Sequence, residues 1–234
     1  MSPGTNGAAA ATSAGARAGA KLLFGDQPGL RARLQTLRPL ICPVDDVLEW
    51  VPERATVFDI GCGAGLLPGL LALRRHQAAI CGVDASPHAI ATARALADRV
   101  GTSTERPPLE FNVTTSTDEW PSGPFGVVMM VDVLHHIPPS AHRRFVSAAL
   151  ARVAPGGRFV YKDMARRPVL HAVANRLHDL VVARDWIHYV DPHVIGALAN
   201  EAGLIPLHAS HHRRWWYAHD LLVFERREPA HETT

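Results

Sequence analysis

The chain has 234 residues, of which 47% are hydrophobic and 20% charged, a composition that suits one globular domain with a buried core. Its 24 Lys and Arg residues nearly balance 22 Asp and Glu residues, and the net charge of +2 is too small for a protein that holds a nucleic-acid backbone. Three cysteines without CxxC spacing predict neither a disulfide framework nor a zinc site, and no apolar run is long enough to span a membrane. We therefore expect a cytoplasmic protein that binds neither nucleic acid nor membrane.

The N-terminal part divides into a low-complexity stretch and a helical stretch. Residues 1–20 are rich in Ala, Gly and Ser and lack large apolar side chains, which predicts a disordered tail because little surface can be buried to offset the entropy of ordering. In residues 21–51 apolar side chains recur at helical intervals, with interruptions at Pro39 and Pro43. This pattern predicts one or two short helices that lead into the core.

From residue 52 onward, short apolar strands alternate with helices. The predicted strands include "ATVFDIG", "AAICGVD", "LEFNVT", "FGVVMMVDV" and "GRFVYKDM". Ser86 before Pro87 and Asp191 before Pro192 are predicted helix N-caps. Near-continuous apolar strands are typical of a parallel sheet covered on both faces, so residues 52–234 are predicted to form a doubly wound α/β domain.

The last two predicted strands close the sheet in the opposite direction. "IPLHASHH" and "HDLLVFERR" are joined by only a short polar and aromatic stretch, so they must form a hairpin. The fold class is therefore a mostly parallel, seven-stranded sheet with a C-terminal antiparallel hairpin and helices on both faces.

A glycine-rich turn follows the first predicted strand in "ATVFDIGCGAG". Gly61, Gly63 and Gly65 allow a sharp turn and a close approach between backbone and ligand, although glycine turns also end ordinary strands. Asp84 ends the second strand 19 residues after Gly65, where a carboxylate can accept hydrogen bonds from both hydroxyls of a ribose. Together these features predict an adenosine-containing cofactor. NAD is the weaker candidate because the G-x-G-x-x-G spacing is not met.

At these positions the chain resembles the class I S-adenosylmethionine-dependent methyltransferases of the small-molecule type. "VFDIGCGAG", "CGVDAS", "VDVLHHIPP" and "APGGRFVYKD" are similar to successive segments of that family, and the resemblance covers roughly residues 52–164. It implies S-adenosylmethionine as the cofactor, with Asp59 near the methionine amino group and Asp84 on the ribose. The expected cofactor-binding residues are Asp59, Gly61, Cys62, Gly63, Gly65, Asp84, Ala85, Thr115, Ser116, Asp132 and Val133. A contact between Asp118 and the adenine is a further hypothesis.

Two adjacent histidines are the candidate catalytic residues. His135 and His136 follow the fourth strand, where the methyl group should lie, and an imidazole can take the proton of a phenol or a carboxylic acid. The alternative is that the pair only packs against the cofactor or caps a helix. The Asn-Pro-Pro-Tyr sequence typical of many amino-group methyltransferases is absent, and this favours an oxygen acceptor.

The sequence also bears on metals and on the acceptor. Asp132 and Asp163 end neighbouring strands, which resembles the metal site of catechol-type O-methyltransferases, but Met164 stands where those enzymes place an asparagine. We therefore predict no metal.

Residues 165–190 are predicted to form a lid-like insertion. The candidate acceptor-binding residues are Arg184, Trp186, His188 and Tyr189, while a second cluster from Arg213 to Tyr217 has no assigned role.

These patterns predict an enzyme that transfers a methyl group from S-adenosylmethionine to a small molecule, at oxygen in preference to nitrogen or carbon. Two alternatives remain at this level, a non-catalytic module that binds an adenosine ligand and an NAD-dependent oxidoreductase. Neither the identity of the acceptor nor the oligomeric state can be inferred from the sequence.

Overall fold

The structure, a computed structural model, describes residues 5–27, 30–74, 79–101, 108–165, 188–214 and 217–228. Its helices are α1 (Thr5–Phe24), α2 (Leu30–Ile41), α3 (Val44–Leu48), α4 (Leu66–Arg74), α5 (Pro87–Val100), α6 (His142–Leu150) and α8 (Pro192–Glu201). Its strands are β1 (Thr56–Ile60), β2 (Ala79–Asp84), β3 (Leu109–Val113), β4 (Phe125–Val131), β5 (Val153–Met164), β6 (Leu204–Arg214) and β7 (Tyr217–Arg226). Single 3-10 turns occur at Thr117–Glu119, Leu134–His136 and Pro139–Ala141.

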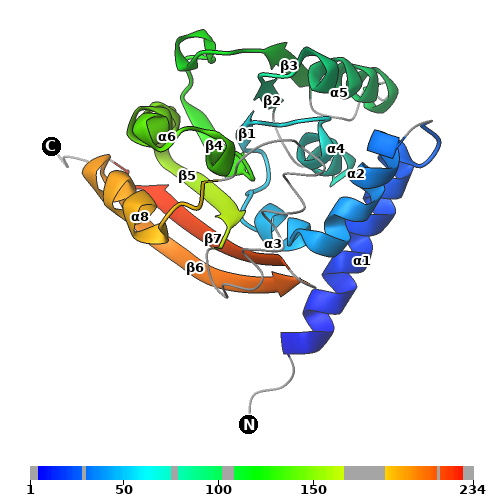
Figure 1. The fold of residues 1–234 in the computed structure, drawn as a ribbon, viewed down its shortest axis with the longest axis horizontal. Coiled ribbons are helices and arrows are strands. Elements are labelled where there is room, and N and C mark those ends of the chain that lie inside the picture. Colours follow the sequence, from blue (N-terminus) through cyan, green and yellow to red (C-terminus); the bar gives the residue numbers. More distant parts are fainter. Residues whose placement is uncertain are drawn as a thin grey trace, which may run out of the picture.

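The strands form one sheet in the order β3-β2-β1-β4-β5-β7-β6 (Figure 1). Strand β7 runs antiparallel to both of its neighbours, and the other pairs are parallel. This confirms the predicted seven-stranded sheet with its C-terminal hairpin. The chain proceeds outward from β1 to β3 and then returns to the other side of β1 as β4, so the strand order reverses between β1 and β4. Ligands bind at such a reversal, beyond the carboxyl ends of the strands.

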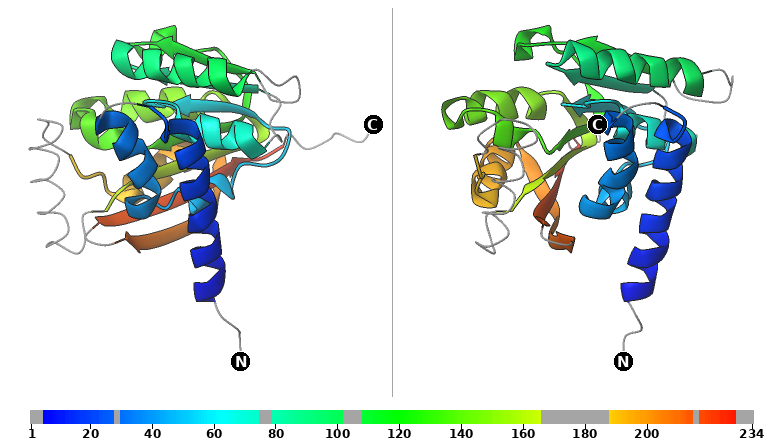
Figure 2. Two further views of the ribbon diagram at one scale, coloured as in Figure 1. Left: turned by 90° about the vertical axis from the view of Figure 1, so that its right-hand side faces the viewer. Right: turned by 45° about the vertical axis from the view of Figure 1, so that its right-hand side comes forward.

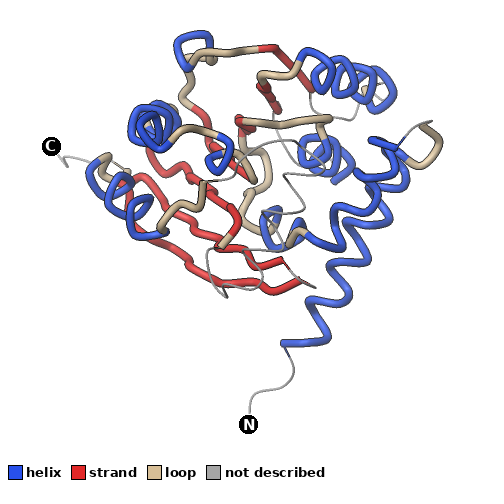
Figure 3. The backbone as a smooth tube through the Cα atoms, viewed as in Figure 1, coloured by secondary structure: helices blue, strands red, loops and turns tan. Residues whose placement is uncertain are grey.

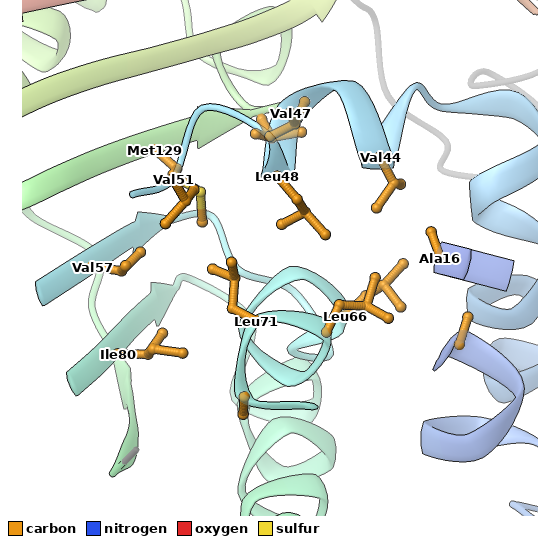
Figure 4. Packing of buried hydrophobic residues seen from close by; sticks show 14 of the residues in the cluster. Ala16, Val44, Val47, Leu48, Val51, Val57, Leu66, Leu71, Ile80 and Met129 are labelled. Carbon is orange, nitrogen blue, oxygen red and sulfur yellow. The ribbon is translucent and has the colours of Figure 1, made fainter. Parts of the chain in front are cut away.

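Alternating strand residues fill two cores, one on each face of the sheet. Val57 and Met129 point toward α1, α3 and α4, where they pack with Leu48 and Leu71 (Figure 4). Phe58 and its neighbours on β4 point the other way, toward α6 and α8. Helices therefore cover both faces of the sheet, as predicted (Figures 1 and 3).

The predicted disorder of residues 1–20 is wrong for residues 5–20, which belong to α1. Alanine is the strongest helix former, and Ala16, Ala20, Leu23 and Phe24 recur at the spacing of one helical face and are buried against the core. At Gly19 an added Cβ would lie 2.4 Å from Leu70 of α4, so small side chains let the two helices approach closely. The first turns of α1 project beyond the sheet (Figure 2). The expected helical segment 21–51 is present as the end of α1, α2 and α3.

The predicted helix signals also hold in detail. The Ser86 hydroxyl accepts a 3.2 Å hydrogen bond from the Ala89 amide, and the Asp191 carboxylate accepts one of 2.9 Å from the His193 amide.

None of the described helices combines the length and the hydrophobicity that crossing a membrane requires. Most of the predicted lid, residues 166–187, lies outside the described residues.

Candidate functional site

A cavity of about 250 Å³ lies beyond the carboxyl ends of β1, β2 and β4, where the strand order reverses. Its lining combines glycine backbone and small polar side chains with a larger number of apolar side chains. The lining residues are Ile60, Gly61, Val83, Asp84, Ala85, Thr114, Thr115, Ser116, Trp120, Asp132, Val133, His136, Ile137 and Phe145. This mixture of an apolar wall with a few convergent polar groups is typical of a small-molecule site.

The glycine turn meets this cavity at Gly61. Gly61, Gly63 and Gly65 have φ values of 72°, 55° and 81°, a left-handed conformation that other residues rarely adopt. A Cβ added at Gly61 would lie 2.4 Å from a methyl group of Val133. The amides of Gly61 and Cys62 already donate to the Val83 carbonyl, at 2.8 and 3.0 Å. Because these two amides are already used, the turn does not offer them to a ligand. The glycines instead allow a ligand to approach the backbone closely.

Asp84 is fixed where β2 ends. Its Oδ2 accepts a 2.9 Å hydrogen bond from the Gly63 amide, and its Oδ1 accepts one of 2.8 Å from the Ser86 amide. A carboxylate has about four acceptor positions, so each oxygen can accept a second hydrogen bond from a ligand. The two amides thus orient Asp84 toward the cavity before any ligand binds.

Asp59, at the end of β1, is buried with an unsatisfied oxygen. Its side chain is 2% exposed, and Oδ2 has no hydrogen-bond partner among the residues that the structure describes. Burial raises the pKa of this carboxyl to about 8, although the nearby Arg38 guanidinium acts in the opposite direction. Asp59 and Arg38 both border a second, very small cavity beside Gly61. The unsatisfied Asp59 oxygen can accept a hydrogen bond from an ammonium group, and the Arg38 guanidinium can bind a carboxylate. The pair therefore suits the amino-acid end of a ligand, which carries both groups.

Asp132 follows β4 in a left-handed conformation, with a φ of 57°, which is unusual for a residue other than glycine. Its Oδ1 accepts a 2.6 Å hydrogen bond from Lys162 Nζ, and its Oδ2 accepts one of 3.1 Å from Arg38. Burial on its own would raise the pKa of Asp132, but the two cations outweigh this effect and hold the pKa well below its usual range. Asp132 is therefore an anion at the edge of the cavity that ties α2 to β4 and β5.

The two predicted catalytic histidines have different surroundings. His136 is exposed and borders the cavity, whereas His135 is 2% exposed and lies behind it, with the ring centroids 4.0 Å apart. His135 Nδ1 makes a short contact with Asp163 Oδ1 at the end of β5. A carboxylate held against Nδ1 orients an imidazole and stabilises its protonated form.

A family described as "Methyltransferase domain" matches residues 32–209, more than half of the chain. The chain belongs to the S-adenosylmethionine-dependent methyltransferases. S-Adenosylmethionine is accordingly its cofactor.

Curated relatives of this methyltransferase carry the name "Ubiquinone biosynthesis O-methyltransferase". One from Paramagnetospirillum magneticum is 30% identical over 158 residues, which cover 65% of this chain and 60% of the relative. Another, from Pseudomonas syringae pv. tomato, is 30% identical over 181 residues, which cover 69% of this chain and 73% of the relative. The chain thus spans about 60% of the length of the first of these relatives.

Solved structures show the same fold. Magnesium protoporphyrin IX methyltransferase from Synechocystis, solved with S-adenosylhomocysteine, superposes with a TM-score of 0.66 at 18% identity, covering 94% of this chain and 97% of that chain. An O-methyltransferase family protein from Burkholderia thailandensis superposes with a TM-score of 0.65 at 24% identity, covering 85% of this chain and 58% of that chain.

Most of the predicted cofactor residues of the methyltransferase meet at the two cavities. The larger cavity is bordered by Gly61, Asp84, Ala85, Thr115, Ser116, Asp132 and Val133, and the smaller one by Asp59, Gly61 and Cys62. Gly63 and Gly65 border neither cavity and instead shape the turn. The Cys62 side chain packs among Ile90, Ala93 and Phe111. Asp118 does not face the cavity, since its exposed carboxylate pairs with Arg144 at 3.1 Å.

Sequence patterns missed part of the site. Trp120 and Phe145 are apolar residues outside the motifs, and Ile137 lies within "VDVLHHIPP" but was given no role, yet all three border the cavity. Arg38 was also missed, because its partner Asp132 lies 94 residues away and no local sequence pattern predicts the pair.

The candidate acceptor-binding residues are only partly described. Arg184 and Trp186 lie outside the described residues. The His188 amide donates a 2.8 Å hydrogen bond to the His135 carbonyl, so this segment does reach the candidate base. In the second cluster Tyr217 is buried and Arg214 lies 3.5 Å from Asp46, while Trp215 and Trp216 are not described.

Asp132, His135 and Asp163 come close enough to hold a metal ion, with ligand atoms within 4.8 Å of one another. Their oxygens and nitrogen are already engaged, however. Asp132 is paired with two cations, and Asp163 contacts His135 Nδ1. A divalent ion would have to displace these partners, so the donor set does not favour a metal.

Proposed function

We propose that this methyltransferase acts on an oxygen atom of a small-molecule acceptor, a phenol or a carboxylic acid, with His135 as the general base. The observation that carries the proposal is the buried contact between His135 and Asp163 next to the cofactor cavity. An oxygen acceptor must lose a proton as it attacks, and a histidine oriented by a carboxylate is suited to take it. The relatives named as O-methyltransferases support an oxygen acceptor.

The cavity also accounts for the adenosine half of the cofactor. Bound S-adenosylmethionine supplies an electrophilic methyl group, so the protein has mainly to position the acceptor and manage one proton. We assign Asp84 to the two ribose hydroxyls, and Thr115 and Ser116 to the adenine edge. Trp120 and Phe145 provide the apolar wall on which the base can pack.

We assign the amino-acid half of the cofactor to the polar groups around the smaller cavity, because they match its charges. Asp59 supplies an unsatisfied oxygen for the ammonium group, and Arg38 supplies a guanidinium for the carboxylate. Asp132 completes this end of the site, next to the expected position of the sulfonium. We also propose that the protein is cytoplasmic, which agrees with its three free cysteines.

Replacing Asp84 with alanine should weaken S-adenosylmethionine binding at least about tenfold, because charge-assisted hydrogen bonds of this kind contribute about 1.5–3 kcal/mol. Isothermal titration calorimetry measures the change directly. Asp98→Ala on the exposed side of α5 is the matched control and should bind like the natural chain. Unchanged affinity in Asp84→Ala would remove the ribose assignment.

Gly61→Ala should weaken cofactor binding by a similar factor or more. The new methyl group would clash with Val133 in a backbone conformation that costs about 1–2 kcal/mol for a residue with a Cβ. Gly196→Ala on α8, where an added Cβ meets nothing within 4 Å, is the control. Equal affinity in the two variants would place the ligand elsewhere.

Asp59 should make cofactor affinity depend on pH. Because its pKa is about 8 in the free protein, the carboxyl is mostly protonated below that pH and must release its proton to pair with an ammonium group. Affinity should therefore rise from about pH 6 to about pH 8 and level off above. Asp59→Asn, which cannot ionise, should flatten this part of the profile. A profile identical in both proteins would contradict the assignment.

The acceptor class can be tested with purified protein. Mass spectrometry of any co-purified ligand comes first, followed by a panel of phenols, carboxylic acids and amines in which formation of S-adenosylhomocysteine is measured. We expect turnover with phenols or carboxylic acids. Cofactor affinity without turnover on any acceptor would favour the non-catalytic binding module, and turnover restricted to amines would overturn the oxygen assignment.

A further inference from the structure

We propose that Asp163 is a positioning residue that holds the His135 ring with its proton on Nδ1, so that Nε2 is the basic atom. This inference rests on the proposed function of His135 as the base, and it assigns a role to a residue that otherwise resembles a metal ligand.

The carboxylate of Asp163 is fixed from several directions. Its Oδ1 accepts a 2.7 Å hydrogen bond from the Met164 amide and also contacts His135 Nδ1. Its Oδ2 accepts a 3.2 Å hydrogen bond from the His135 amide and a 3.4 Å hydrogen bond from the Tyr161 hydroxyl. These donors leave the carboxylate little freedom to rotate away from the imidazole, so the side chain of His135 is oriented by a rigid group.

The main chain of His135 is also held in place next to Asp163. Asp163 is at the carboxyl end of β5 and His135 follows β4, its parallel neighbour, so the two residues meet at one edge of the sheet. The His135 amide and its ring both bind the one carboxylate. A residue held at both its main chain and its side chain has a defined ring orientation.

The distribution of charge favours this role over a purely structural ion pair. Lys162 is next in the chain, but it points to the opposite face of β5 and pairs with Asp132. The described neighbours of Asp163 also include Tyr161, Asp220 in register on β7, the buried His219, and Asp132, which lies within 4.8 Å of His135 and Asp163; none of these is a lysine or an arginine. A proton taken up by His135 would therefore create a cation directly beside a buried carboxylate. That arrangement stabilises the imidazolium at the moment when the acceptor loses its proton.

The same geometry distinguishes Asp163 from a metal ligand. An ion bound to His135 Nδ1 needs that nitrogen without a proton, whereas a hydrogen bond to Asp163 needs the proton on it. The proton position on this one ring therefore separates the two roles, and it can be measured without any acceptor.

Long-range ¹H–¹⁵N NMR of the ¹⁵N-labelled full chain at about pH 8 reports the tautomer of each histidine. The chain has 14 histidines, so the His135 signals are assigned by their loss in His135→Gln. We expect the Nδ1–H form in the natural chain. Asp163→Asn should shift the ring toward the Nε2–H form, because an amide NH₂ can donate to Nδ1. Tyr161→Phe, which removes only the 3.4 Å hydrogen bond, is the matched control and should keep the Nδ1–H form.

An Nε2–H or cationic ring in the natural chain would overturn the inference, as would an unchanged tautomer in a folded Asp163→Asn variant. Selective broadening of the His135 signals by added Mn²⁺ would overturn it in favour of a metal site. If Asp163→Asn does not fold, the spectra of the natural chain and of Tyr161→Phe still decide the question. Since this measurement uses no acceptor, its failure is distinct from failure of the acceptor panel.

Discussion

Replacing His135 with alanine should lower turnover about 10²–10⁴-fold and change S-adenosylmethionine affinity little. The ring does not border the cofactor cavity, but it lies against the carboxylate that orients it and beside the ring of His136, which does border the cavity. The loss should shrink for acceptors that are already ionised at the assay pH, because these no longer need a base. Steady-state kinetics with phenols of low and high acidity gives the comparison.

His136→Ala is the matched control for this experiment. Its ring is exposed and borders the cavity, so we expect weaker binding of cofactor or acceptor with a smaller effect on turnover. Equal losses for ionised and un-ionised acceptors in both variants would show that the histidines only shape the site. Asp132 would then be the next candidate base, although its two cations make it a weak one.

Lys162→Met should lower the free energy of unfolding by about 3–5 kcal/mol, the range measured when one member of a buried ion pair is removed. The Lys162 side chain has no exposed surface and its Nζ lies 2.6 Å from Asp132. Without the lysine, Asp132 keeps Arg38 as a partner, but the carboxylate is only 14% exposed, so water compensates little of the charge that Lys162 balanced. Urea denaturation of the natural chain and the variant measures the difference.

Two further variants distinguish the ion pair from packing alone. Adding Asp132→Asn to Lys162→Met removes the carboxylate that has lost its lysine, but it also removes the ionic partner of Arg38, so we expect only part of the lost stability to return. Arg143→Ala, which breaks an exposed pair with Glu201, should leave stability nearly unchanged. If Lys162→Met were as stable as the natural chain, the buried pair of Lys162 and Asp132 would not contribute to the stability of the sheet.

The sheet was predictable because its signals are local. Apolar runs such as "TVFDI", the Ser86 cap and the glycine turn each identify an element within a few residues, and the structure confirms them. The same reasoning failed for α1, where a sequence without large side chains looked unable to pack. It packs because Gly19 and Ala20 allow a close approach to α4, which depends on a partner far away in the sequence.

The site shows the same division between local and distant signals. Asp84 ends β2, and Thr115 and Ser116 follow β3, so the topology of a parallel sheet places them at one edge and at the cavity. Asp163 also ends a strand, so its place at this edge was predictable, but its contact with His135 was not. Arg38 and Lys162 pair with Asp132 across 94 and 30 residues, respectively. No periodicity reports such pairings. They decide which charges meet in the site, and so they decide the proposed chemistry.

The central claim is that this site delivers the methyl group of S-adenosylmethionine to an oxygen atom. The most direct measurement uses cofactor labelled with ¹³C at the methyl group and follows the label into the product by NMR. The account predicts a labelled methoxy or methyl ester carbon from the natural chain, and little product from His135→Ala with an un-ionised phenol. A label attached to nitrogen or carbon, or undiminished oxygen methylation by His135→Ala, would contradict it.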